Sequence, residues 1–367
     1  MCRRPCRRDR CESQAVSGGA PKRYVVHIGP MKTASTYLQQ CLKAARSQLL
    51  AQGIYYAREF IAENNKFMHM RLHYALMRNR MQELRQGFAA LNACGAHTVV
   101  LSCEHMMFQR EAGYELLREL TEGAAVDIVY FSRRWSDRYA SIWNQTLLMG
   151  GSQTFPEFFM SMLSGKSPNF YPPKVRAAGL QLDFDYAVIW RMVAQVFGRE
   201  SLTIFPYSTT VDDGGDVYEL FCKTVLGLAD APKVTLAGEK LWASMPTEDA
   251  ELLRVLNDMH FRATGEQDAA VRGAFLKERK RIDFGGVAAA MQASLTETEI
   301  DDGAPYFDPP YGRMSEFRDR VIGGGEVFAR KRKDIRHFKS GYLLAGGVRE
   351  ALQSLYARVA AGLMDAE

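Results

Sequence analysis

The sequence predicts an α/β fold built around a mostly parallel sheet. Short apolar runs rich in β-branched and aromatic residues alternate with longer stretches of helical spacing over the first 230 residues. Strands that are separated by helices in this way pack into a parallel sheet with helices on both faces. A length of 367 residues and a hydrophobic fraction of 47% are enough for one large α/β domain.

Four segments have the composition of buried strands, because each is short, apolar and rich in Val, Ile, Phe or Tyr. They are residues 24–29 (YVVHIG), 97–102 (HTVVLS), 126–132 (VDIVYFS) and 201–207 (SLTIFPY). Apolar residues at helical spacing fill the intervals between and after these strands. The predicted helical stretches are residues 35–53, 64–91, 136–148, 186–197 and 217–226.

The last third of the chain is more irregular. Beyond about residue 230 the pattern becomes helical, and it is interrupted by DPPYG (308–312) and GGG (323–325). We therefore expect one domain over residues 24–367, in which residues 230–367 form a mainly helical elaboration. Within it, the basic stretch ARKRKDIRHFK (329–339) is predicted to be a solvated charged helix.

The positive charge is concentrated at the start of the chain. Residues 1–23 contain seven basic and two acidic residues, which accounts for the whole net charge of +5. This stretch lacks apolar periodicity and predicts a disordered basic tail. Because the remaining chain is electrically balanced, we expect no nucleic-acid partner. It has no apolar run long enough for a membrane span or a secretory signal, so a cytoplasmic location is expected.

The cysteines do not form a recognisable metal or disulfide pattern. Seven are scattered along the chain, an odd number that favours reduced thiols. No HExxH motif or paired Cys/His spacing is present, so no metal site is predicted.

The segment GPMKTASTYLQ (29–39) lies where the first strand turns into the first helix. Such a turn presents free backbone N–H groups and the positive end of a helix, which suits a phosphate. Lys32 adds a cation, and Thr33, Ser35 and Thr36 add hydroxyl donors. The lysine follows the glycine by three residues, which does not match the Walker pattern G-x-x-x-x-G-K-[ST]. The alternative is an ordinary capped helix start with a surface lysine.

A second strand followed by a helix carries another possible phosphate site. In VDIVYFSRRWSDRYASIWNQ (126–145), Arg133 comes directly after the predicted strand. Arg138, Ser141 and Gln145 are spaced to lie on one face of the following helix. The Arg133 guanidinium and the Ser141 hydroxyl can both reach one phosphate, the first as a fork of donors and the second as a single donor.

Together these two segments resemble the PAPS-dependent sulfotransferase family, specifically its bacterial and carbohydrate-type members. The 5′-phosphosulfate loop of that family reads approximately P-K-T-G-T-T-x-L, and here the chain reads MKTASTYL. The family's 3′-phosphate element has a serine eight positions after an arginine, the spacing of Arg133 and Ser141. The likeness continues more faintly through residues 190–208 to about residue 228. Two departures are Ala34 in place of the loop glycine and RRW in place of an R-D-P-like start.

The resemblance implies a P-loop NTPase-like three-layer sandwich and the transfer of a sulfuryl group from PAPS to a hydroxyl. The acceptor class would be a carbohydrate, a glycolipid or another small metabolite. Lys32 would stabilise the leaving oxygen, and Arg133 and Ser141 would bind the 3′-phosphate. The 5′-phosphosulfate would be bound by Lys32, Thr33, Ala34, Ser35 and Thr36. The scheme requires no metal.

The general base is sought at the end of another strand. VVLSCEHM (99–106) places Glu104 and His105 just past the carboxyl end of a strand, the edge where ligands bind in open parallel sheets. Related sulfotransferases often use a glutamate, so the resemblance favours Glu104, with His105 second. His69 and His73 are further candidates. Each histidine has the alternative of being a partly buried ring without a chemical role.

Two other functions fit parts of the same pattern. A P-loop phosphotransferase would need a Walker lysine and an acidic Mg²⁺ ligand, for which Glu104 is the available stand-in. A non-catalytic nucleotide-binding module is compatible with Ala34 and with the altered second element. NFYPPK (169–174) and Tyr311 are candidates for an acceptor cleft, since aromatic faces stack on sugars, and packing is the alternative for both.

Overall fold

The structure is a computed structural model that describes residues 22–62, 67–164, 185–236, 245–279 and 285–364. The chain divides into two units, each assembled from separate segments. The first, here called the sheet unit, takes residues up to 132 with residues 187–237 and 315–328. The second, here called the hairpin unit, takes residues 133–186, 238–314 and 329–367. The region beyond residue 230 therefore contributes to both units.

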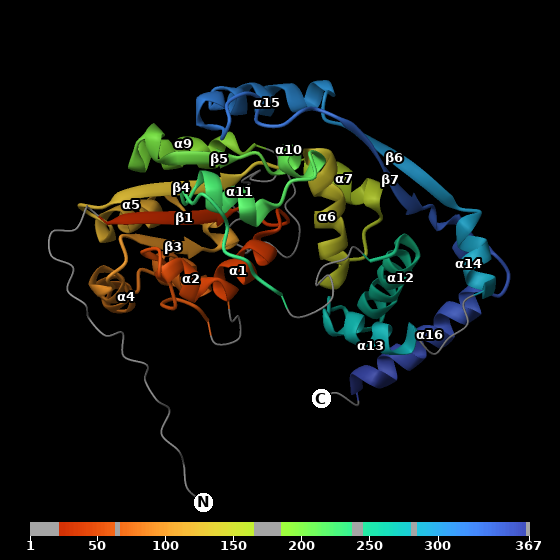
Figure 1. The fold of residues 1–367 in the computed structure, drawn as a ribbon. Coiled ribbons are helices and arrows are strands. Elements are labelled where there is room, and N and C mark those ends of the chain that lie inside the picture. Colours follow the sequence, from red (N-terminus) through yellow and green to blue (C-terminus); the bar gives the residue numbers. More distant parts are fainter. Residues whose placement is uncertain (1–21, 63–66, 165–184, 237–244, 280–284, 365–367) are drawn as a thin grey trace, which may run out of the picture. The chain divides into compact units, whose positions relative to one another are not determined.

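The core of the sheet unit is a five-stranded parallel sheet in the order β2-β3-β1-β4-β5 (Figure 1). Its strands are β1 (Arg23–Gly29), β2 (Ile54–Tyr56), β3 (Thr98–Ser102), β4 (Ala125–Phe131) and β5 (Leu202–Phe205). The central strand β1 pairs with β3 on one side and with β4 on the other, both in parallel. This arrangement brings the carboxyl ends of β1 and β3 to one edge, with His27 level with Ser102.

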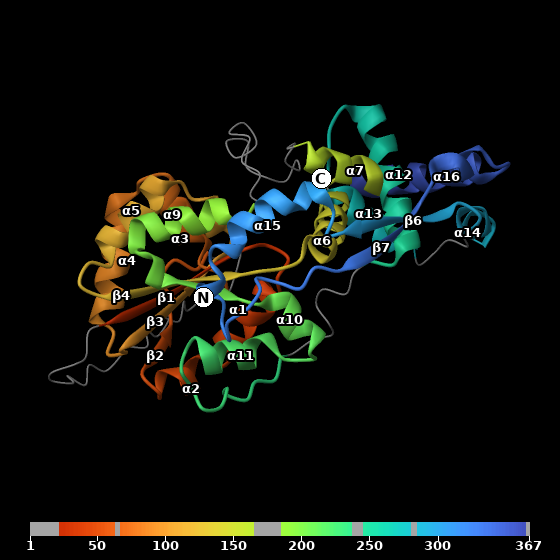
Figure 2. The ribbon, with the colours of Figure 1, turned by 90° about the horizontal axis from the view of Figure 1, so that it is seen from above.

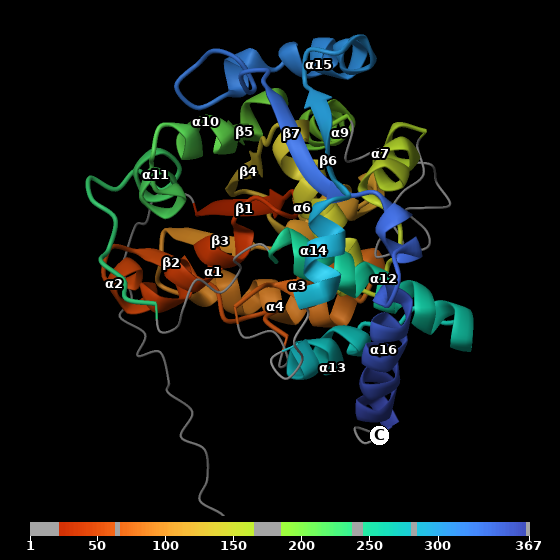
Figure 3. The ribbon, with the colours of Figure 1, turned by 90° about the vertical axis from the view of Figure 1, so that its right-hand side faces the viewer.

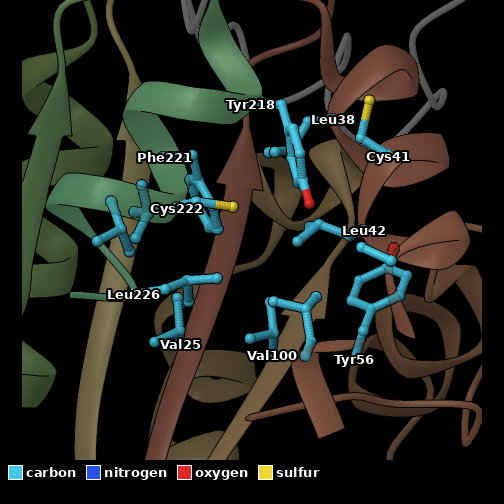
Figure 4. Close-up of a cluster of buried hydrophobic side chains, with 14 of the residues drawn as sticks. Val25, Leu38, Cys41, Leu42, Tyr56, Val100, Tyr218, Phe221, Cys222 and Leu226 are labelled. Carbon is cyan, nitrogen blue, oxygen red and sulfur yellow. The ribbon is translucent and has the colours of Figure 1, made fainter. Parts of the chain in front are cut away.

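Helices cover both faces of this sheet because successive strand residues point to opposite sides. On one face, Val25 and Val100 belong to a buried cluster with Leu42 of α1 and Phe221 of α11 (Figure 4). On the other face, the Tyr24 ring lies 5.8 Å from Phe88 of α4, between ring centroids. Figure 2 shows the sheet between these two helix layers. The predicted α/β class, a three-layer sandwich around a central parallel sheet, is confirmed.

The helices of the first layer are α1 (Ser35–Ala44), α2 (Arg46–Leu50) and α11 (Val217–Thr224). The opposite layer contains α3 (Met70–Met77), α4 (Met81–Ala93), α5 (Glu111–Leu120) and α9 (Ala187–Phe197). The short helix α10 (Tyr207–Asp212) follows β5. Each fully buried aliphatic or aromatic side chain in these layers stabilises the fold by roughly 1.5–3 kcal/mol relative to exposure.

Two predictions in the sheet unit need correction. The helix predicted through residue 53 ends earlier, at Leu50, and the edge strand β2 follows it. β2 has only three residues, too few for a recognisable period. The helix predicted over 64–91 is two helices, α3 and α4, with residues 63–66 outside the described chain. The break coincides with Asn79, whose φ of 49° is left-handed and therefore not helical.

The hairpin unit combines helices with a two-stranded antiparallel sheet (Figure 3). Its strands are β6 (Leu295–Asp301) and β7 (Arg332–Phe338). Its helices are α6 (Trp135–Leu148), α7 (Phe155–Leu163), α12 (Thr247–Thr264), α13 (Ala270–Arg279), α14 (Gly285–Gln292), α15 (Asp308–Ser315) and α16 (Val348–Met364). Beyond residue 230, the predicted helical character is confirmed for α12, α13, α14, α15 and α16.

The prediction of a charged helix over 329–339 was wrong, because most of that stretch is β7. The many charged residues of this stretch obscure the two-residue period of a strand, in which Ile335 is buried and the residues on either side of it are exposed. The pairing register also sets opposite charges across the hairpin, as between Glu297 and Arg336. At the hairpin end, Arg332 Nε lies 3.1 Å from Asp301 Oδ2.

Most of the predicted basic tail, residues 1–21, lies outside the described chain. Its last two residues are ordered by contacts with the sheet unit. Lys22 Nζ donates to the carbonyl oxygen of Leu91 at 2.7 Å, and Arg23 already belongs to β1. Within the described segments, no helix is both long and apolar enough to pass through a membrane.

Candidate functional site

The turn between β1 and α1 has an unusual backbone. Gly29, Lys32 and Ala34 have φ values of 109°, 68° and 54°, all in the region that L-residues rarely occupy. Ala34, with ψ 22°, is left-handed and immediately precedes α1. Ala34 therefore has the left-handed backbone that a glycine would adopt at no steric cost, and glycine is the residue at this position of the P-K-T-G-T-T-x-L pattern.

The N-terminus of α1 is not capped by the side chain of any described residue, and its first turn contains no acidic residue. The first backbone bond inside the helix is donated by Leu38 N to Ala34 O at 3.0 Å. The amides that precede Leu38 in the first turn therefore have no intrahelical acceptor. This combination of donors and a positive helix end fits an anion such as phosphate or sulfate.

The three hydroxyls of the turn have different surroundings. Thr33 is fully buried and donates to the carbonyl oxygen of Pro30 at 2.6 Å, while Ser35 donates to the same oxygen at 3.4 Å. Thr36 is half-buried and forms no side-chain hydrogen bond with another described residue. Two of the predicted hydroxyls thus brace the turn, and Thr36 is the one left for a ligand.

The strained position gives a stability prediction. Ala34→Gly is expected to raise the free energy of unfolding by about 0.5–1 kcal/mol, because relief of a left-handed alanine outweighs the added chain entropy of glycine. Urea denaturation measures the change. Ala44→Gly, at an exposed position of the same helix, is the matched control and should lose about 1 kcal/mol. An equal decrease in the free energy of unfolding of both variants would contradict the inference that Ala34 is strained.

Glu104 lies directly beside this turn. β3 ends at Ser102 and is followed by a short 3₁₀ helix, Glu104–Phe108. A Cβ atom at Gly29 would lie 2.8 Å from the carbonyl oxygen of Glu104, so the two backbones meet where only glycine fits. The structure therefore brings the predicted glutamate to the start of the predicted anion-binding turn.

A chain of polar side chains holds the Glu104 carboxylate. Gln39 Nε2, from α1, donates to Glu104 Oε2 at 2.8 Å and to Ser102 Oγ at 3.1 Å. The Ser102 hydroxyl lies 2.8 Å from His27 Nδ1 of β1. Neither Gln39 nor His27 was assigned a role from the sequence. The available signal was a glutamine at helical spacing to Leu42 and Ser35, on the side of α1 that faces the sheet.

Three histidines near this edge are held neutral by burial. Desolvation lowers the pKa of His27 to about 3 and that of His69 to about 4, and it also lowers the pKa of His73 to about 4. His69 Nδ1 accepts from Ser102 N–H at 3.0 Å, and His69 Nε2 lies 3.1 Å from Ala57 O. Both nitrogens of His69 are thus engaged by backbone groups, the arrangement of a structural ring.

His105 is placed differently. It is half-buried and forms no side-chain hydrogen bond with another described residue. Its ring centroid lies 5.9 Å from that of His73, whose Nδ1 is 2.9 Å from Gln109 Nε2. Burial lowers the pKa of His105, and the neighbouring Glu104 carboxylate partly opposes that effect. Glu104 and His105 thus remain the two acid–base candidates nearest the turn.

The second predicted element belongs to the hairpin unit and is described by itself. Arg133 follows β4 in the chain, and its carbonyl oxygen accepts from the Tyr186 hydroxyl at 2.7 Å. Arg138, Ser141 and Gln145 all lie on α6, as the spacing predicted. Their surroundings differ, since Arg138 is fully buried whereas Ser141 is half-buried.

The start of α6 is neutralised from within the protein, in contrast to that of α1. Asp302 accepts from Ser136 N at 2.9 Å and from the Ser136 hydroxyl at 2.6 Å. Arg134 is buried and pairs with Asp137 at 2.7 Å. A carboxylate thus already occupies the N-terminus of α6.

The candidate acceptor residues are only partly described. Residues 169–174 lie outside the described chain. Tyr311 is buried, and the Arg330 guanidinium lies 3.9 Å from the centroid of its ring. Within the described residues, no group of three or more His, Cys, Asp or Glu side chains is arranged to hold a metal ion.

No protein-family model and no curated protein matches the chain. Solved structures do match, and one of them is the crystal structure of a sulfotransferase from Alicyclobacillus acidocaldarius. The match covers 67% of this chain and 95% of that chain, at 16% sequence identity and a TM-score of 0.38. Such a likeness is too low to assign a family or an activity.

Proposed function

We propose that the chain transfers a sulfuryl group from PAPS to a hydroxyl of a carbohydrate, a glycolipid or another small acceptor. One observation carries the proposal. A helix start without a cap of its own, preceded by Lys32, lies in the same unit as Glu104, whose backbone meets the turn at Gly29. An anion site beside a candidate base is what group transfer from an anionic donor to a hydroxyl requires.

The turn would hold the 5′-phosphosulfate. The first-turn N–H groups of α1 and the Thr36 hydroxyl supply neutral donors, and Lys32 supplies the charge. In-line transfer leaves negative charge on the bridging oxygen of the donor. We assign Lys32 to that oxygen, where a preorganised cation lowers the barrier.

Glu104 would accept the proton of the acceptor hydroxyl. Gln39 engages Oε2, and Glu104 forms no ion pair with another described residue of the sheet unit. Oε1 and the negative charge are therefore left for proton transfer. His105, one residue further along, is the alternative base.

Arg133 and Ser141 would bind the 3′-phosphate, the group that distinguishes PAPS from ATP. This assignment is supported by their spacing and by the helical placement of Ser141 on α6. A guanidinium can donate two parallel hydrogen bonds to a phosphate, and the half-buried serine adds a single donor.

The proposal is tested by thermal stabilisation with adenosine 3′,5′-bisphosphate against ADP. A ligand that binds only the folded chain stabilises it by about 2.7 kcal/mol at 100 times its Kd. We expect a larger rise in melting temperature with the bisphosphate, and loss of that preference in Arg133→Ala. Lys43→Ala, which removes an exposed cation at the far end of α1, is the control.

Each other outcome has a definite meaning. An equal response to both nucleotides would favour a phosphotransferase, and no response to either would overturn the proposal. Selective binding of the bisphosphate without sulfuryl transfer to any hydroxyl acceptor would identify a non-catalytic nucleotide-binding module.

A further inference from the structure

We propose that Gln39 is a positioning residue, which fixes the Glu104 side chain beside the anion-binding turn so that one carboxylate oxygen is free to take the acceptor proton. This inference rests on the proposed sulfuryl transfer. Its basis is the continuous hydrogen-bonded chain from His27 through Ser102 and Gln39 to Glu104.

The orientation of the Gln39 amide follows from its neighbours. An ionised carboxylate can only accept hydrogen bonds, so the amide group that faces Glu104 is the NH₂. Its Nε2 lies 2.8 Å from Glu104 Oε2 and 3.1 Å from Ser102 Oγ, which uses both amide hydrogens. The amide is thus held between two acceptors from β3 and the residues that follow it.

The rest of this hydrogen-bonded series continues into the sheet. Ser102 Oγ accepts from Gln39 and also lies 2.8 Å from His27 Nδ1, where either atom can be the donor. His27 is fully buried, and burial keeps its ring neutral. Each hydrogen bond in this series, from His27 to Glu104, shares a side chain with the next one. The position of the Glu104 carboxylate is therefore sensitive to residues deep in the sheet.

This arrangement does not maximise stability. Gln39 Oε1 and His27 Nε2 are buried and have no hydrogen-bond partner among the described residues. Unsatisfied buried polar atoms cost free energy, and an apolar side chain in place of Gln39 would remove one of them. A buried glutamine at this position is therefore better explained by its hold on Glu104 than by packing.

Gln39 is the one described residue that donates a side-chain hydrogen bond to Glu104. Tyr56 of β2, Cys103 and His105 are titratable groups of the described chain that interact electrostatically with Glu104. Burial raises the pKa of Tyr56 and Cys103 and lowers that of His105, so all three are uncharged near neutral pH. The backbone of Glu104 is fixed against Gly29 and its side chain by Gln39.

The first test needs no acceptor and no turnover. Glutamate carboxyl carbons are labelled with ¹³C, and the Glu104 resonance is identified by its loss in Glu104→Gln. At neutral pH we expect this resonance to move in Gln39→Met and to stay in place in Gln109→Met. Gln109 is the matched control, a buried glutamine whose amide binds His73 and does not contact Glu104.

The second test is a double-mutant cycle on the transfer rate. Gln39→Met should lower kcat about tenfold with little change in the KM for PAPS, and it should have no further effect in a Glu104→Gln background. Gln109→Met should change kcat by the same factor in the wild-type and in the Glu104→Gln background. An unmoved Glu104 resonance, or an effect of Gln39→Met that persists without Glu104, would overturn the inference. Selective nucleotide binding with a moved resonance and no transfer would overturn the proposed function instead.

Discussion

Replacing Lys32 by alanine is expected to lower kcat for sulfuryl transfer by about 10²–10³-fold, the effect of removing one preorganised donor from a developing negative charge. The loss should appear mainly in kcat, because the charge on the bridging oxygen forms during the reaction. Lys32 is half-buried, so the truncation creates no large cavity in the core. The ratio of the two kcat values is measured at saturating PAPS, with an acceptor that the wild type sulfates.

Two variants make this result specific. Lys32→Arg retains the charge and should recover part of the rate, with a penalty because the guanidinium fork differs from a compact ammonium. Lys43→Ala removes a cation from the far end of the same helix and should leave kcat unchanged. Wild-type turnover in Lys32→Ala would remove Lys32 from the catalytic machinery.

Glu104→Gln is expected to lower kcat by about 10²–10⁴-fold, the usual contribution of a general base. The variant keeps the size of the side chain and an oxygen that can accept from Gln39, so the turn and nucleotide binding should persist. The thermal shift with adenosine 3′,5′-bisphosphate should therefore equal that of the wild type. The measurement combines this shift with the transfer rate in the same preparation.

His105→Ala distinguishes the two candidate bases. If Glu104 is the base, loss of the imidazole should reduce kcat less than tenfold, since His105 makes no side-chain hydrogen bond to another described residue. A larger loss in His105→Ala than in Glu104→Gln would transfer the role of base to His105.

The strands of the sheet could be predicted because their residues face a buried interior on both sides. Residues 97–102 and 126–132 read as apolar runs, and both became central strands of the sheet. β2 and the β6–β7 hairpin could not be predicted in the same way. β2 is too short to show a period, and the exposed charged residues of β7 outnumber the buried ones that mark its strand period.

The candidate site could be predicted only where the residues that form it are close together in the sequence. The turn at residues 29–39 combines a strand end, a lysine and a helix start within a few residues. The adjacency of Glu104 to Gly29 depends on the parallel pairing of β1 with β3, which no local pattern reveals. Gln39 illustrates the same limit, because its two acceptors, Ser102 and Glu104, are more than sixty positions away.

The buried histidines of the sheet unit have a further consequence, for proton uptake on unfolding. His27, His69 and His73 have pKa values of about 3 to 4 in the fold, against an ordinary value of 6.5. Below pH 6.5 the unfolded chain binds more protons than the folded one, so acid favours unfolding. Each ring contributes about 1.4 kcal/mol per pH unit between 6.5 and its folded value. Three such contributions approach the typical 5–15 kcal/mol stability of a domain within two pH units. The burial that keeps these three rings neutral thus sets an acid limit on the conditions under which the anion-binding turn exists.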